Sequence, residues 1–154
     1  MKLAEALANR ADLQRRVEQM RGRLQKSALV QEGESPPEDP GELLAEMERI
    51  VSEHEGYVRR INRTNLAATL ADGETTLTDA LAHRDALSLR HGNLKILVST
   101  ASDRVPRYGR AEIRILPAVD IGPLRRRMDE LARRRRELDT AIQQANWATD
   151  LVEG

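Results

Sequence analysis

Hydrophobic residues recur at three- and four-residue intervals in four long stretches of the chain, a spacing typical of amphipathic helices. The first stretch predicts a helix over about residues 2–27. Three more helices are predicted from about Pro40 to Asn65, from about Leu77, and after Asp120. The residues just before the last three helices are Asp39, Thr76 and Asp120, which belong to types that cap helix N-termini.

Two longer connections separate the helices within each predicted pair. Ala28–Gln31 in the first has the composition of a short strand, and Ala111–Leu116 in the second is β-branched, partly alternating and followed by Pro117. We therefore expect a mainly α fold with a short two-stranded β-ribbon formed by these connections. The helices themselves are expected to form two antiparallel hairpins in a bundle that resembles a coiled coil.

The two predicted hairpins are related in sequence. Residues 3–13 (LAEALANRADL) and 77–87 (LTDALAHRDAL) are identical at six of eleven positions, at an offset of 74 residues. The second helices align at an offset of 81, with Asp39 matching Asp120. We interpret residues 1–65 and 77–147 as two copies of one hairpin within a single domain, 1–154.

The amino-acid composition excludes several kinds of chemistry and a membrane-spanning helix. The 154 residues include no Cys and no Phe, so disulfides, thiolate metal sites and thiol chemistry are excluded and the core must be aliphatic. The longest run without a charged residue has ten residues, 140–149, whereas a membrane span needs about 20 apolar residues. The N-terminus opens into a charged amphipathic helix without an export signal. We expect a cytoplasmic protein that does not span a membrane.

Charge is distributed unevenly although the formal net charge is zero. Residues 125–136 carry seven Arg against two acids, a net charge of plus five, and residues 31–56 carry nine acids against one Arg, a net charge of minus eight. The Arg-rich helix 124–147 would suit nucleic-acid binding. However, the acidic segment contains the repeat equivalent of that helix, and opposite charges on equivalent helices favour pairing, either within a chain or between chains. The sequence therefore favours the protein itself as partner over nucleic acid.

Several segments carry a resemblance to a known family. They are INRTN (61–65), DGETTLTDALAHRD (72–85), RYGRAEI (107–113), VDI (119–121) and IQQANW (142–147). In their order and spacing the chain resembles the septicolysin-like family of small bacterial proteins. The family name suggests a haemolytic toxin, but thiol-activated cytolysins need a cysteine and a large β-rich body, which this sequence does not provide. The resemblance supplies no catalytic residues.

Two arginines stand among the apolar positions of the predicted helices. Arg10 and Arg84 occupy equivalent places in the repeat, and His54 is matched in the same way by Arg135. A buried arginine needs a counter-charge, and nearby candidates are Glu5, Asp12, Asp79 and Asp85. One interpretation is a structural layer of salt bridges, and the other is an anion-binding site. The candidate site residues are Arg10, Asn62, Arg63, Asn65, Asp79 and Arg84.

The polar connector 62–79 has an alternative role in ending and capping helices, with Asn65, Asp72-Gly73 and Thr76 as the relevant residues. The sequence has neither of the metal-site spacings Glu-x-x-His and His-Glu-x-x-His at its three histidines, His54, His83 and His91. The only remaining candidate pair of metal ligands is Asp79 with His83. No catalytic triad, phosphate loop or dinucleotide motif is present. We therefore expect no cofactor, no metal and no catalytic residue, and a homo-oligomeric interaction or scaffold protein. A small-molecule or anion-binding protein, including an enzyme, is the alternative.

Overall fold

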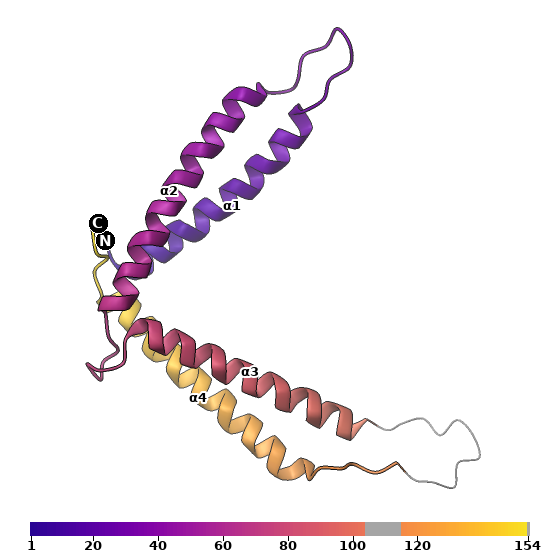
Figure 1. The fold of residues 1–154 in the computed structure, drawn as a ribbon, viewed down its shortest axis with the longest axis vertical. Coiled ribbons are helices and arrows are strands. Elements are labelled where there is room, and N and C mark those ends of the chain that lie inside the picture. The colour runs from indigo at the N-terminus through magenta and orange to yellow at the C-terminus, as the bar shows by residue number, and fades with distance from the viewer. Residues whose placement is uncertain (104–114, 154) are drawn as a thin grey trace, which may run out of the picture. The chain divides into compact units, whose positions relative to one another are not determined.

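The computed structural model describes residues 1–103 and 115–153, which form four long helices (Figure 1). These are α1 (Leu3–Ser27), α2 (Pro40–Ala67), α3 (Leu77–Ser102) and α4 (Ile121–Ala148). They pack in pairs, α1 against α2 and α3 beside α4, so each pair is an antiparallel hairpin (Figure 1). The prediction of a mainly α fold with four helices is confirmed.

Helices α2 and α3 begin at residues whose side chains satisfy the first free backbone N–H groups. The Asp39 carboxylate accepts hydrogen bonds from Gly41 N (2.7 Å) and Glu42 N (3.2 Å) at the start of α2. The Thr76 hydroxyl accepts from Asp79 N (3.1 Å) and donates to the Asp79 carboxylate (2.7 Å) at the start of α3. Both pairs follow the N-cap chemistry expected from the sequence.

The chain divides into two compact units. One comprises Met1–Thr69 with Gln143–Gly154, and the other comprises Leu70–Ile142. In the first unit, the described C-terminal residues are tied back to the beginning of α1. Leu3 N donates to Thr149 O (3.0 Å) and Leu151 N donates to Met1 O (2.9 Å), and Lys2 forms an ion pair of 2.8 Å with Asp150.

The first hairpin is held by an aliphatic seam between α1 and α2. Its buried centre consists of Leu13, Met20, Leu43 and Ile50, and Val17, Leu24, Met47 and Tyr57 pack against it. At the end of the hairpin that lies beside the N- and C-termini, Ile61 and Thr64 of α2 are fully buried. The Thr64 hydroxyl donates to Arg60 O (2.8 Å) and accepts from Val152 N (3.0 Å), so this polar group is satisfied inside the core.

The predicted β-ribbon is not supported. Ala28–Gln31 forms a loop in which Leu29 is 88% exposed, and a turn with Gly33 at φ 85° follows it. A strand needs a partner for its backbone groups, and this segment has none among the described residues. Positions 104–114, which include Arg107–Arg110 and most of the second predicted strand, lie outside the described residues. Ile115 and Leu116 are exposed and not in a strand.

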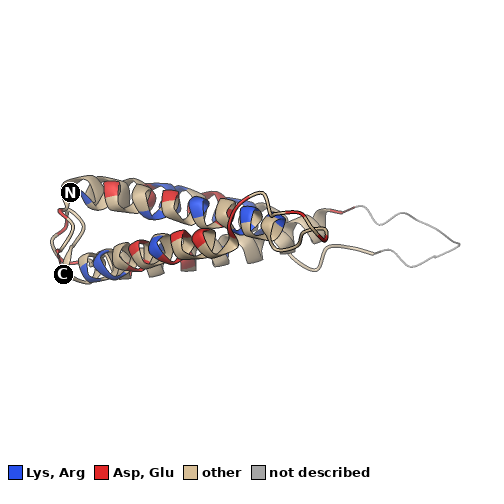
Figure 2. Ribbon diagram, turned by 90° about the horizontal axis from the view of Figure 1, so that it is seen from above, with Lys and Arg blue, Asp and Glu red and all other residues tan. Residues whose placement is uncertain are grey.

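None of the helices, in the part of the chain that is described, is long and apolar enough to cross a membrane. Instead, Lys and Arg alternate with Asp and Glu along the helices, as Figure 2 shows. Charged side chains on the helix surfaces are therefore the main candidates for binding residues.

Candidate functional site

The first hairpin contains a pocket of about 400 Å³ beside the Arg10 side chain. Arg10, Ala11 and Gln14 of α1 line one wall, and His54 and Val58 of α2 line the other. Arg10 and His54 are half-buried and interrupt the apolar seam at the same height. Among the described residues no carboxylate lies within 4.0 Å of the Arg10 guanidinium, and no acid lines the pocket.

Arg84, which is the repeat equivalent of Arg10, has a different environment in the second hairpin. Its guanidinium pairs with Asp85 at 3.3 Å and with Asp139 of α4 at 3.7 Å. Asp85 is one of the counter-charges predicted from the sequence, whereas Asp139 is a partner that only the structure shows. Which residue of α4 faces Arg84 depends on the pairing of the two helices, and the sequence does not show that pairing directly.

The remaining candidate residues have local roles or open surroundings. Asp79 is engaged with Thr76 in the cap of α3. Asn62 and Arg63 are exposed on the last turns of α2, and Asn65 is half-buried. By the unit boundaries Arg10, Asn62, Arg63 and Asn65 belong to the first unit, and Asp79 and Arg84 to the second. The pocket at Arg10 is lined by none of the other five residues.

The connector between the hairpins forms a tight turn stabilised by Asp72. Its carboxylate accepts hydrogen bonds from the Thr75 hydroxyl (2.7 Å), Glu74 N (3.0 Å) and Thr75 N (3.0 Å). These bonds, that from the Thr75 hydroxyl foremost, lower the pKa of Asp72 because they stabilise the carboxylate. Gly73 follows with φ 73°, which favours glycine.

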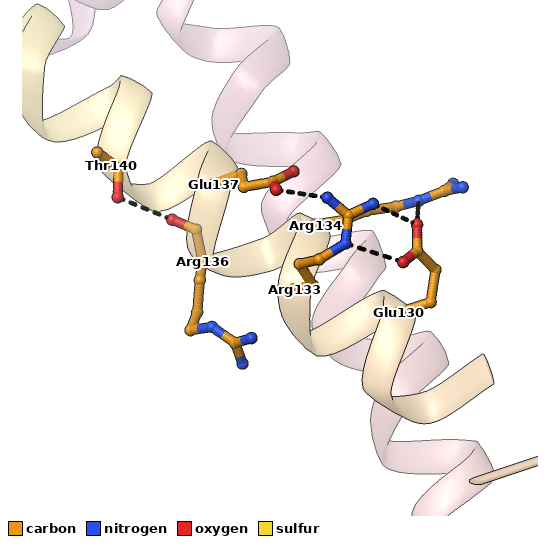
Figure 3. Close-up of polar contacts among 6 residues, drawn as sticks. All are labelled: Glu130, Arg133, Arg134, Arg136, Glu137 and Thr140. Carbon is orange, nitrogen blue, oxygen red and sulfur yellow. Dashed lines mark hydrogen bonds and ion pairs between the residues drawn. The ribbon is translucent and has the colours of Figure 1, made fainter. Parts of the chain in front are cut away.

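The Arg-rich helix α4 neutralises part of its own charge. Glu130 accepts from Arg133 (2.8 and 3.0 Å) and from Arg134 (2.8 Å), and Glu137 accepts from Arg133 at 2.5 Å (Figure 3). The hydrogen bonds from Arg133 and Arg134 lower the pKa of Glu130 to about 2, and Glu130 in turn raises the pKa of Arg133. The Arg136 side chain points away from these carboxylates, and the Thr140 hydroxyl donates to the Arg136 backbone carbonyl at 3.0 Å (Figure 3).

The acidic segment 31–56 is neutralised at its beginning. Arg23 of α1 forms a two-pronged ion pair with Glu38, which raises the pKa of Arg23 and lowers that of Glu38. Further along, Glu55 lies 3.7 Å from Arg59. Glu42, Glu48 and Glu53, by contrast, have no ion-pair partner within their own hairpin among the described residues.

Within residues 1–103 and 115–153, no three His, Asp or Glu side chains are grouped in a way that could hold a metal ion. His54 lies in the pocket with Arg10, His83 is exposed and His91 is half-buried. The pocket residues Ala11, Gln14 and Val58 were not among the predicted site residues. Their only signal in the sequence is the three-four spacing that places Gln14 next to Arg10 and Val58 next to His54.

Comparisons with known proteins give a family but no activity. A family model described as a family of unknown function (DUF6847) matches residues 10–151. A crystal structure of a functionally unknown conserved protein from Corynebacterium diphtheriae is similar, with 41% sequence identity, a TM-score of 0.91 and coverage of 99% of both chains. A search of curated proteins found no match. The resemblance to septicolysin-like proteins stays a prediction.

Proposed function

The chain belongs to the family of unknown function DUF6847, and from its geometry we propose that it is a non-catalytic interaction protein that associates with copies of itself. The main support for the proposal is the distribution of charged side chains on the two hairpins. The second helices of the two hairpins are equivalent in the repeat and lie in oppositely charged segments, 31–56 and 125–136. Among the described residues these charges are only partly neutralised within each hairpin.

On α2 the unpaired acids are Glu42, Glu48 and Glu53. On α4, Arg126, Arg127 and Arg136 have no carboxylate within 4.0 Å in their own hairpin among the described residues, unlike Arg133 and Arg134. Complementary charged helices steer association and suppress wrong partners. A chain that carries both members of such a pair is complementary to a second copy of itself.

Apolar exposure on α3 supports the same proposal. Leu77, Ala80, Leu87 and Val98 are buried and lie on one side of the helix. On the opposite side of the helix, Ala82, Leu89 and Ile96 recur every seven residues, and Leu89 and Ile96 are 70% and 68% exposed. Burying one such side chain gains roughly 1.5–3 kcal/mol. The stripe has one apolar residue per seven, half the number in a coiled-coil seam, so it offers a narrow apolar contact to a second copy of α3.

Size-exclusion chromatography with light scattering tests the proposal over the micromolar concentration range. We expect a dimer or larger assembly that dissociates as salt rises, because screening weakens exposed charge pairs. A protein that is monomeric at every concentration at low salt would contradict the proposal.

Charge reversal identifies the helices involved. The acid-to-base variant is Glu42→Lys with Glu48→Lys and Glu53→Lys, and the base-to-acid variant is Arg126→Glu with Arg127→Glu and Arg136→Glu. Each alone should be monomeric, because both charged helices then carry the same sign. An equimolar mixture of the two should form a complex. Loss of association in one variant without complex formation in the mixture would refute pairing between α2 and α4.

A further inference from the structure

The pocket at Arg10 occupies the place where the second hairpin has two carboxylates. At the repeat offset of 74, Arg84 corresponds to Arg10 and Asp85 to Ala11. At the offset of 81, Asp139 corresponds to Val58. The first hairpin thus has the arginine but neither of the two acids that pair with its equivalent.

The two substitutions explain why the pocket exists. Ala11 and Val58 both line it, and neither side chain can reach or neutralise a guanidinium. In the second hairpin Asp85 approaches Arg84 from α3 and Asp139 approaches it from α4. The first hairpin therefore has an arginine flanked, on both helices, by space and by apolar side chains.

Neighbouring polar groups do not supply the missing negative charge. Asp12, the nearest acid in sequence, is exposed and paired with Arg15 at 3.0 Å. Asn9 and Tyr57, which precede Arg10 and Val58 in the sequence, are engaged with each other, because Asn9 donates to the Tyr57 hydroxyl at 3.1 Å. The lining contains one guanidinium, one imidazole and one amide, and a partly buried cation without a counter-charge favours an anion from solution.

We propose that this pocket binds a small organic carboxylate, with a short dicarboxylate as the best fit. Arg10 offers a planar fork of N–H donors that matches a carboxylate, and the Gln14 amide and His54 imidazole add donors from both helices. The two acid groups of the ligand would take the places of the Asp85 and Asp139 carboxylates. A volume of about 400 Å³ lies within the range of roughly 300–1,000 Å³ of small-molecule sites.

The binding test uses succinate, acetate and inorganic phosphate as separate probes at low ionic strength. Isothermal titration calorimetry gives the affinity, and amide NMR shifts give the location. Succinate should bind more tightly than acetate, with shifts around residues 10–14 and 54–58. Arg10→Gln should weaken succinate binding about tenfold or more, the effect of losing a charge-assisted hydrogen bond. The control Arg16→Gln, on an exposed side chain of the same helix, should leave the affinity unchanged.

Exchanging the residues that differ between the two hairpins distinguishes an effect on succinate binding from an effect on folding. Ala11→Asp with Val58→Asp recreates the acids of the second hairpin, and it should abolish succinate binding while circular dichroism retains the helical signal. If this variant fails to fold, Ala11→Asp alone tests the same point with a smaller loss. The reverse variant, Asp85→Ala with Asp139→Val, should create a second carboxylate site at Arg84.

Three results would overturn the proposal. They are absence of succinate binding at millimolar concentration, equal affinity in Arg10→Gln and wild type, and binding of phosphate without binding of either carboxylate. All three are independent of the oligomeric state, which light scattering reports separately.

Discussion

Ile61 and Ile96 provide a matched test of which surfaces the hairpins bury. Both are isoleucines in long helices, but Ile61 of α2 is 1% exposed and Ile96 of α3 is 68% exposed. Ile61→Ala removes three buried carbon atoms, which costs about 2.4 kcal/mol at roughly 0.8 kcal/mol per carbon. The cavity left in the seam raises the expected loss of unfolding free energy to about 3–4 kcal/mol.

Ile96→Ala makes the same chemical change without that loss in the isolated chain. Alanine has the higher helix propensity, so the variant should be neutral or more stable by a few tenths of a kcal/mol. If the α3 stripe of Ala82, Leu89 and Ile96 contacts a second copy, Ile96→Ala instead lowers the association constant. Its stability should then depend on protein concentration less than that of the wild type.

Urea unfolding followed by far-UV circular dichroism measures both variants, at several protein concentrations. The midpoint should fall for Ile61→Ala with an unchanged slope, since the surface exposed on unfolding is the same. A cost for Ile61→Ala below about 1 kcal/mol, well under the usual range for buried Ile→Ala changes, would refute the described packing of α2. So would equal effects of the two substitutions at high dilution.

Three further predictions concern polar contacts. Thr64→Val keeps the shape of a buried side chain but removes the acceptor for Val152 N, so denaturant titration should show a loss of about 1 kcal/mol. Asp39→Ala removes the cap from Gly41 N and should cost about 0.5–2 kcal/mol in the same assay; no change would contradict the cap. The lowered pKa of Glu130, about 2 against an ordinary 4.5, adds stability above pH 4.5 that disappears as pH falls toward 2. Glu130→Gln should therefore be less stable than wild type near neutral pH, and acid titration should show this difference vanishing; a pH-independent difference would disprove it.

Much of the helical architecture could be predicted from the sequence because its signals are local. The three-four spacing of Leu3, Leu13 and Met20 determines which side of α1 is apolar, and these three residues are buried. Asp39 and Thr76 mark helix starts through hydrogen bonds that span three residues or fewer. The strand predicted at Ala28–Gln31 was wrong because a strand depends on a distant partner, which local composition does not specify.

The candidate site was predictable only in part. Arg10 was identified because a charged residue interrupts an apolar spacing. Its surroundings were not, since Val58 and His54 are more than forty residues away and their height along α2 depends on how the hairpin pairs. The same reason explains why Asp139 was not foreseen beside Arg84.

The sequence alone thus determined the helices, the caps of α2 and α3, the repeat and the opposite charge of segments 31–56 and 125–136, because each of these follows from residue type at fixed local spacing. Only the tertiary structure decided which charges are satisfied. Two equivalent arginines differ because Asp85 and Asp139 lie within 4 Å of one, whereas Ala11 and Val58 stand beside the other. A charge interacts with whatever the fold places within a few ångströms, whether or not it is near in the sequence.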